Sequence, residues 1–203
     1  MEVLDSIGTL LGSSWASGIN LYMTVAGLGI AQRMHWLNLP GNMNILANPL
    51  IILVAVLMYI IEFVADKIPF VDSLWDTVHT FIRPVGGAAL GYMASSHIGP
   101  AAQIPVALVS AAVALNSHLT KATSRVAINS APVPGTNAVA SVAEDTSVFG
   151  VLYLIVKHPI VAALIVLLFI AFSIWFLRKM FRFLKKALGF IFKSREKPAT
   201  VTQ

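Results

Sequence analysis

Long stretches without a charged residue divide the chain into segments that are typical of membrane helices. Four such stretches cover most of the first 177 residues: Ser6–Gln32, Met34–Ile61, Pro84–Thr120 and His158–Leu177. The last has about 20 residues, which at about 1.5 Å per residue match a hydrocarbon core of roughly 30 Å. The pattern predicts an all-α, polytopic transmembrane helix bundle with about five spans. We expect these spans at Leu10–Gln32, Leu50–Val64, Ile104–Leu119, Ala138–Val156 and His158–Leu177.

One apolar segment is too short to cross a bilayer. Val85–His97 lies between Pro84 and the helix-breaking sequence Ile98-Gly99-Pro100, and a helix of this length reaches only about 20 Å. Irregular backbone at membrane depth is tolerated only inside protein or beside a wet cavity. We therefore predict a re-entrant half-helix here. A sixth span at this position stays open as an alternative, because both arrangements keep most Lys and Arg on the side of the C-terminal tail.

Two hairpins share a sequence pattern that is compatible with an internal repeat. One hairpin follows Ser17–Asn20 and the other follows Pro134–Asn137, so both begin with Gly-x-Asn and both later turn at a proline. If Val85–His97 is re-entrant, one span separates the hairpins and they face opposite ways, as in the inverted repeats of transporters. Asn20 and Asn137 would then either bind an anionic group at a half-helix end or simply cap helices.

The composition agrees with a membrane protein. Hydrophobic residues make up 57% of the chain and charged residues 11%, and the mean hydropathy is +0.80. A soluble domain has roughly 25% charged residues. The chain has no cysteine, which excludes disulfides, thiolate metal sites and cysteine nucleophiles. The first eight residues carry no basic stretch, so we expect no cleavable signal peptide.

Basic residues are concentrated near the C-terminus. Residues 178–197 contain eight of the 14 Lys and Arg residues and one of the nine acids. We therefore divide the chain into a transmembrane domain, residues 1–177, and a basic amphipathic tail, residues 178–203. A basic stretch after an apolar span is typical of the cytoplasmic side of a membrane protein. We expect the tail to bind anionic lipids, and we expect no nucleic-acid partner.

Acidic residues in or beside apolar segments are the strongest candidates for a functional site. A charge at the centre of a membrane helix costs about 3 kcal/mol, so such residues usually face a cavity or a partner. Six of the nine acids are placed in this way: Glu62, Asp66, Asp72, Asp76, Glu144 and Asp145.

Four polar side chains between the predicted spans fall on one helical face. They are separated by four, three and four residues: Asp72, Asp76, His79 and Arg83. Such spacing aligns side chains on one side of a helix. Carboxylates and an imidazole bind a divalent cation, and a histidine carries protons near neutral pH. The face therefore predicts a proton relay or a cation site, with Asp72, Asp76 and His79 as metal ligands. The alternative is an amphipathic helix at the membrane surface whose acids face water.

The adjacent pair Glu144-Asp145 interrupts an otherwise apolar segment. It lies about two turns after Asn137, and Ser141 shares a helical face with Asp145. Because adjacent residues point about 100° apart, one acid is able to face a cavity while the other meets a partner. Four bases are candidates for neutralising this pair: Arg125, Lys121, His118 and Arg83. The alternative is a capping pair at the mouth of a helix that begins later.

The motifs resemble those of one known family. The segment from Glu62 to Pro84, EFVADKIPFVDSLWDTVHTFIRP, resembles the central motif of bacterial membrane proteins known as domain of unknown function 4126. Two further motifs are similar to motifs of this family: Ser17–Asn20, and Asn129–Asn137 with Ser141, Glu144 and Asp145. The resemblance covers about residues 5–175. The family brings no activity with it, so the resemblance implies a shared architecture and a functional use of these motifs.

Together these features lead us to expect a small, proton- or cation-coupled secondary transporter of a bacterial inner membrane, with a cytoplasmic C-terminus. The substrate, which we do not identify, would bind between the two hairpins, and Glu144 and Asp145 would carry the coupling ion. A gate or second ion site would consist of Asp66, Asp72, Asp76, His79 and Arg83. The candidate binding set is completed by Asn20, Glu62, Arg125, Asn137 and Ser141. A chain of about 200 residues is compatible with a homodimer.

Three other functions stay open at this point. In a lipid-handling protein, Arg83, Arg125 and the half-helix ends would hold a lipid phosphate. In a metal-dependent intramembrane enzyme, Asp72, Asp76 and His79 would hold the metal, although the sequence shows no nucleophile motif. The third alternative is a structural assembly factor without transport activity. Beyond a coupling proton or divalent cation, we expect no cofactor.

Overall fold

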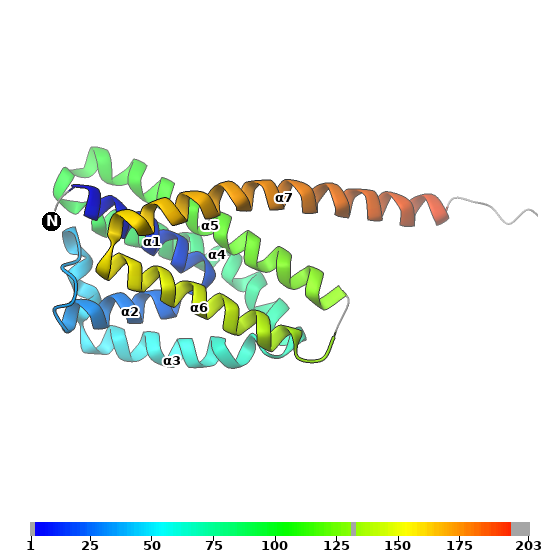
Figure 1. The fold of residues 1–203 in the computed structure, drawn as a ribbon, viewed down its shortest axis with the longest axis horizontal. Coiled ribbons are helices and arrows are strands. Elements are labelled where there is room, and N and C mark those ends of the chain that lie inside the picture. The colour runs from blue at the N-terminus through cyan, green and yellow to red at the C-terminus, as the bar shows by residue number, and fades with distance from the viewer. Residues whose placement is uncertain (1–2, 131–132, 196–203) are drawn as a thin grey trace, which may run out of the picture.

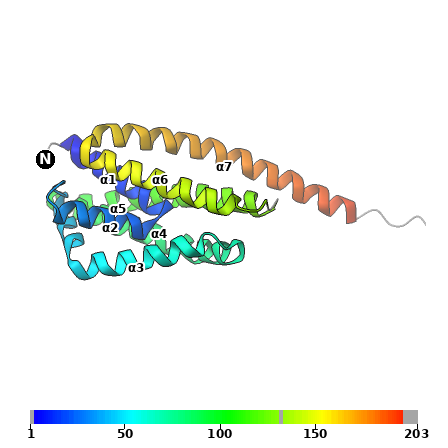
Figure 2. The ribbon, with the colours of Figure 1, turned by 60° about the horizontal axis from the view of Figure 1, so that its bottom comes forward.

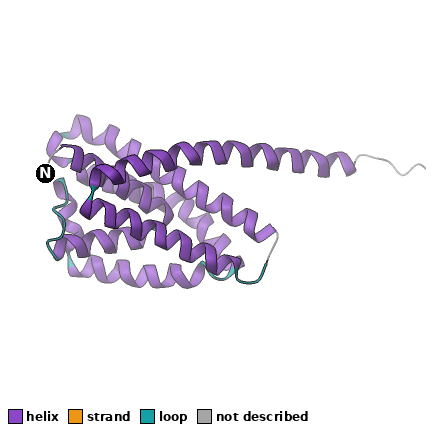
Figure 3. Cartoon of the chain, in the orientation of Figure 1, coloured by secondary structure: helices purple, strands orange, loops and turns teal. Residues whose placement is uncertain are grey.

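The chain folds into a bundle of helices. A computed structural model describes residues 3–130 and 133–195, and within these ranges it contains helices and no strand (Figure 3). The helices, with η marking 3-10 turns, are α1 Val3–Ile19, α2 Leu21–Arg33, η1 Gly41–Ala47, α3 Pro49–Ala65, α4 Pro69–Ala94, η2 Ser96–Ile98, α5 Pro100–Ser130, α6 Thr136–Lys157 and α7 Pro159–Arg195. The all-α prediction is therefore confirmed.

Helices α3 to α7 run along the bundle in alternating directions, and α3 and α7 lie at opposite edges of it (Figures 1 and 2). Four of these helices begin at a proline: Pro49, Pro69, Pro100 and Pro159. Proline is favoured at the first helical position because its φ angle is already suitable and its missing N–H would have no partner there. These prolines therefore fix where most of the long helices start.

Helices α1 and α2 form a helical hairpin, so the single continuous helix predicted at Leu10–Gln32 is wrong. Their outer ends lie at the same end of the bundle, where Asp5 and Trp36 line one cavity together with Pro159. The two helices meet at Asn20 in the interior (Figure 1). With 13 residues, α2 reaches about 20 Å, less than the thickness of a hydrocarbon core. Hydropathy alone does not separate this hairpin from a span, because both of its helices are apolar.

Helix α4 continues through Pro84 and has 26 residues. The half-helix predicted at Val85–His97 is therefore not a separate element, and that prediction is wrong. A proline inside a helix removes one hydrogen bond and crowds the preceding turn. Close packing against α5 compensates, because a Cβ added at Gly87 would lie only 2.5 Å from the Cβ of Ala114.

The two predicted hairpins do not form an inverted repeat. Helices α3 and α7 both begin at the end of the bundle that holds the outer ends of α1 and α2 (Figure 1). Two full-length helices, α4 and α5, separate the pair α2–α3 from the pair α6–α7. The second pair therefore runs in the same direction as the first.

Several helices are suited to a membrane. Three helical segments in the described part of the chain are long and apolar enough to cross a membrane: α5, α6 and residues Pro159–Phe183 of α7. A fourth span results if η1 and α3, which are bent by 72° relative to each other, are taken as one. Large apolar side chains such as Leu53 and Leu57 are exposed, whereas Glu62 and Arg83 are buried. This inversion of the usual distribution, together with the long apolar helices, suggests a membrane protein.

Helix α7 crosses the predicted domain boundary at residues 177 and 178 without a break and extends to Arg195. The first part of the basic tail is therefore a helical continuation of the preceding apolar segment. Residues 196–203 of the predicted tail lie outside the described residues, as do the side chains from Ala187 onward.

Candidate functional site

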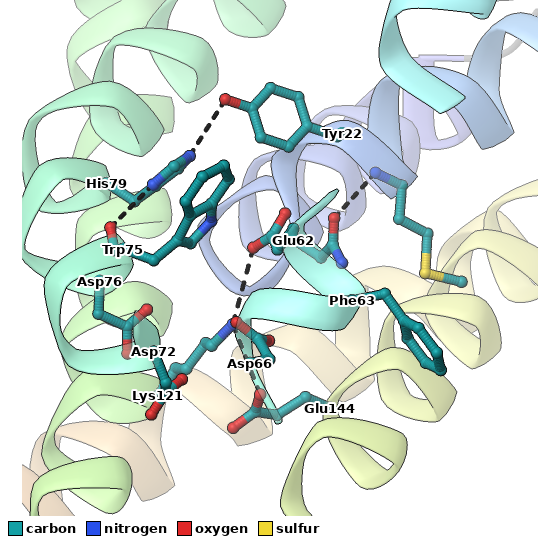
Figure 4. A network of polar contacts seen from close by, with 12 residues as sticks. Tyr22, Glu62, Phe63, Asp66, Asp72, Trp75, Asp76, His79, Lys121 and Glu144 are labelled. Atoms are coloured by element: carbon teal, nitrogen blue, oxygen red, sulfur yellow. Dashed lines mark hydrogen bonds and ion pairs between the residues drawn. The ribbon is translucent and has the colours of Figure 1, made fainter. Parts of the chain in front are cut away.

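Eight charged side chains form one connected group inside the bundle, which we call the charge network (Figure 4 shows part of it). Five are acids and three are bases, and every ion pair joins atoms no more than 3.8 Å apart. The members are Glu62, Asp66, Asp72, Asp76, Arg83, Lys121, Arg125 and Glu144. Seven of them are buried and Glu144 is half-buried. The network connects four helices, because α3, α4, α5 and α6 each contribute at least one of these side chains. Asp66 is the residue that directly follows α3.

Arg83 joins the network to the hairpin of α1 and α2. Its Nη2 pairs with Glu62, and its Nη1 lies 3.6 Å from Oδ1 of Asp76. Nη1 also donates a hydrogen bond of 3.1 Å to the carbonyl oxygen of Gly18, in the last turn of α1. The last carbonyls of a helix have no partner within it and carry a partial negative charge. The guanidinium group therefore stabilises the end of α1 in the middle of the bundle.

His118 is held in its neutral form beside Arg83. Nη1 of Arg83 lies 2.7 Å from Nδ1 of His118. An arginine is only a donor, so Nδ1 accepts and the ring proton is on Nε2. Nε2 lies 2.9 Å from Oγ1 of Thr80, whose hydroxyl donates to the carbonyl oxygen of Asp76. The ring thus links α5 to α4 without adding a positive charge.

Lys121 lies between the acids of α3 and α6. Its Nζ is 2.7 Å from Oδ2 of Asp66 and 3.5 Å from Oε2 of Glu144. Oε1 of Glu62 is 3.7 Å away. The ammonium group of Lys121, on α5, thus connects α3 and α6, which supply acids but no base to the network.

Arg125 forms a two-pronged pair with Glu144. Nη2 lies 2.7 Å from Oε2, and Nε lies 3.0 Å from Oε1, a geometry that the planar guanidinium group favours. Nη1 donates to the carbonyl oxygen of Asn137 at 3.0 Å, and Nε is 3.8 Å from Oδ1 of Asp72. Because α6 begins at Thr136, the alternative in which Glu144 and its neighbour cap a later helix is wrong.

The carboxylates of α4 are buried without hydrogen-bond donors. Both oxygens of Asp72 and both oxygens of Asp76 have no such partner among the described residues, and the same holds for one oxygen each of Glu62 and Asp66. A buried acceptor without a donor costs about 1–3 kcal/mol, and more when it is charged. The alternative in which the acids of this helix face water is therefore wrong: they point into the bundle and are under-supplied with positive charge.

Asp145 lies next to the network and is bound to the tip of the hairpin. The side-chain amide of Asn20 donates to Oδ1 of Asp145 at 3.0 Å, while its own oxygen accepts from the backbone N–H of Met23 at 2.9 Å. The hydroxyl of Tyr59 donates to Oδ2 at 3.3 Å. No base whose side chain the structure describes forms an ion pair with this carboxylate. Asn20 thus caps α2 and positions Asp145 at once.

His79 is directed toward the hairpin. Its Nδ1 lies 2.8 Å from the carbonyl oxygen of Trp75 and its Nε2 lies 3.1 Å from the hydroxyl of Tyr22 (Figure 4). The ring also stacks on Trp75, with centroids 4.6 Å apart. Across the described part of the chain, no three side chains of His, Cys, Asp or Glu are grouped so that they could hold a metal ion. The predicted metal ligands Asp72, Asp76 and His79 are therefore not arranged around a common point.

Gly18 allows the hairpin to approach α5 closely. A Cβ at this position would lie 2.1 Å from the carbonyl oxygen of Ala114 and 2.0 Å from Oγ of Ser117. Ser117 in turn donates to the carbonyl oxygen of Trp15 at 2.8 Å. Two carbonyl oxygens near the end of α1 thus accept hydrogen bonds from outside the hairpin: that of Trp15 from Ser117 and that of Gly18 from Arg83.

The structure brings most of the predicted site residues together. Ser141 and Asn137 lie at its margin: the hydroxyl of Ser141 is buried without a hydrogen-bond partner among the described residues, and the amide of Asn137 donates to Asn129 at 2.9 Å. Tyr22 and Tyr59 belong to the site but were not predicted from the sequence. A tyrosine in an apolar segment is ordinary near a membrane surface, so no sequence signal distinguished them.

Comparisons with known proteins give one result. A family model described as Domain of unknown function (DUF4126) matches residues 7–179. None of the curated proteins and none of the solved structures compared with the chain matches it.

Proposed function

Because this chain belongs to the family described as Domain of unknown function (DUF4126), which names no activity, we propose a function from the charge network. We propose that the protein is a small secondary transporter of a bacterial inner membrane, coupled to protons or to a cation. In this proposal α3 to α7 cross the membrane and the hairpin α1–α2 penetrates it halfway. The basic end of α7 lies on the cytoplasmic side, where Lys and Arg are enriched.

One observation carries this proposal: the buried acids outnumber the bases. The network has five acids and three bases, and Asp145 adds a sixth carboxylate without an ion pair in the described part of the chain. Unpaired buried charge is strongly unfavourable. Bound protons or cations would balance the excess, and a site that takes up and releases positive charge is what ion coupling requires.

The hairpin offers the element that would move. In transporters, broken helices often form the ion and substrate site, and alternating access arises when one part rocks against another. Here the hairpin tip is tied to the network through side-chain hydrogen bonds, from Arg83 to Gly18 and from Asn20 to Asp145. Binding of a proton or cation to Asp145 would change the second bond, and with it the position of the tip.

A lipid-phosphate site at Arg83 and Arg125 is less well supported. Both guanidinium groups are buried, and both already pair with carboxylates. A bound phosphate would add negative charge to a network in which acids already exceed bases. The arrangement therefore favours a positively charged ligand.

The thermal unfolding of the detergent-purified protein tests this proposal. The midpoint would be measured between about pH 5 and about pH 8, and with Na⁺, K⁺, Mg²⁺ or Ca²⁺ replacing choline. A ligand that binds the native state raises the midpoint, so we expect a rise at low pH or with one of the cations. Asp76→Asn should reduce this rise. Asp5→Asn, which changes an acid at the far end of α1, is the matched control and should keep it.

Two results would contradict the coupling. One is a midpoint that does not change across the pH range or with any cation. The other is an unchanged response in Asp76→Asn. Either result would make a structural role for the network the better explanation.

A further inference from the structure

An apolar groove runs along the hairpin between α3 and α6, with α2 as its floor. The cavity has a volume of about 670 Å³, which lies in the usual range for small-molecule sites. Met23 and Gly27 line it from α2, Tyr59 from α3, and Phe149 and Tyr153 from α6. Three of these five side chains are aromatic, so the groove combines an apolar floor with aromatic walls.

Asp145 does not itself line the groove but lies directly behind two residues that do, Tyr59 and Phe149. Asp145 precedes Phe149 by one helical turn on the same face of α6, and the hydroxyl of Tyr59 donates to it at 3.3 Å. Its residual exposure is 9%. A carboxylate that has no ion pair with a described side chain therefore lies just beyond the aromatic walls.

Given the transport function proposed above, on which this inference rests, we propose that the groove binds a lipophilic organic cation. The positive charge lies beside Asp145, and the apolar groups lie along α2 against Phe149 and Tyr153. The cation would enter from the side, between α3 and α6, where the groove faces the lipid.

The charge of the ligand follows from the surroundings of the inner end. Aromatic faces attract cations, and Asp145 forms no ion pair with a described side chain, while Lys67 and Lys121 act on it only at longer range. Lys157, at the other end of the groove, is 12 residues further along α6 and so about 18 Å away. An anionic head at the inner end would be repelled by Asp145 and by the excess of acids behind it.

The size and apolarity of the ligand follow from the lining. A small hydrated ion would lose its hydration shell in a groove that offers it few polar groups, whereas an organic cation brings its own apolar surface. A lipid acyl chain is the competing occupant. It is neutral, so its binding would not depend on Asp145.

Equilibrium dialysis with labelled tetraphenylphosphonium tests the inference on the full-length protein in detergent. We expect saturable binding, and at least about tenfold weaker competition by the neutral triphenylphosphine oxide. Asp145→Asn should weaken tetraphenylphosphonium binding at least about tenfold, while Asp145→Glu, which keeps the charge, should retain most of it. Asp5→Asn should bind like the wild type.

A second variant covers the case in which Asp145→Asn does not fold. Tyr153→Leu removes an exposed aromatic ring without touching the charge network, and it should weaken binding severalfold through the lost ring contact. If triphenylphosphine oxide competes as well as tetraphenylphosphonium, or if Asp145→Asn or Tyr153→Leu binds with wild-type affinity, the inference is overturned and an acyl chain is the better occupant.

The failure of this inference is distinguishable from the failure of the coupling proposal. The dependence of the unfolding midpoint on pH and on inorganic cations is measured without any organic cation. If that dependence is present and tetraphenylphosphonium does not bind, only the groove inference fails. If the dependence is absent as well, the transport proposal fails with it.

Discussion

The side-chain amide of Asn20 lies 3.0 Å from the carboxylate of Asp145, although 125 residues separate them along the chain. This hydrogen bond connects the tip of the hairpin of α1 and α2 to the middle of α6. The same amide group caps the first turn of α2 through its oxygen. The side chain of Asn20 therefore has two roles: it caps the helix that leads the chain back out of the bundle, and it positions Asp145, which forms no ion pair with a described side chain.

Replacing Asn20 by alanine should lower stability and alter the response to cations. The loss of an N-cap costs about 1–2 kcal/mol, and Asp145 loses a donor in addition. Asn48→Ala is the matched control, because Asn48 caps α3 through its side chain at an exposed position. Both variants should have lower unfolding midpoints. Only Asn20→Ala should change how the midpoint depends on pH or cations, and an equal change in both would show that Asn20 acts as a cap alone.

Gly18→Ala should be strongly destabilising. Its Cβ would overlap with the carbonyl oxygen of Ala114 at 2.1 Å, so the hairpin would have to move away from α5 and the hydrogen bond from Arg83 would lengthen. Overpacking of this kind costs about 1–3 kcal/mol or more. Gly150→Ala is the control, because a Cβ there would meet no atom of the described residues within 4 Å. A helical glycine in open space should gain about 0.5–1 kcal/mol on this change. Circular dichroism during heating would show opposite shifts in the two midpoints.

The pair Arg125 and Glu144 should show energetic coupling. Removing one partner of a buried ion pair costs about 3–5 kcal/mol because the other charge is left without a partner. The double variant Arg125→Gln with Glu144→Gln should lose less than the sum of the single variants, by about 0.5–3 kcal/mol. A double-mutant cycle of unfolding free energies measures this difference. Strict additivity would mean that the two side chains act independently, against the contact geometry.

Asp72→Asn and Asp66→Asn should have effects of opposite sign at neutral pH. Asp72 accepts no hydrogen bond from a described residue, and its contact with Arg125 is long, at 3.8 Å. Its neutralisation reduces the excess of negative charge and should raise the unfolding midpoint. Asp66 accepts a bond of 2.7 Å from Lys121, so its neutralisation leaves an ammonium group under-compensated and should lower the midpoint. Equal shifts in both variants would argue against an excess of negative charge in the network.

The face of α4 could be predicted from the sequence, because the spacing from Asp72 to Arg83 aligns its side chains on any helix. The partners of that face could not. Lys121 meets Asp66 across 55 residues, and such a pairing depends on how α3 and α5 pack. The sequence indicated where acids would be buried but not which base each of them would meet.

The course of the chain was harder to predict than its helices. Asn20 stands between apolar residues with no proline beside it, so the reversal of direction there leaves no mark in the hydropathy. At Pro84 the error was the reverse: the proline predicted a break in the helix, but α4 continues through it and packs against α5. Tertiary contacts decided both positions, and the error at Pro84 produced the inverted repeat that the structure does not contain.

The hairpin also has a consequence for the order of assembly. Because it enters and leaves the bundle at one end, no part of it has to be threaded past the other helices. Its first helix packs against α4, α5, α6 and α7, all of which follow it in the chain and are synthesised later. The hairpin therefore has all of its packing neighbours in place only after α7 has been made.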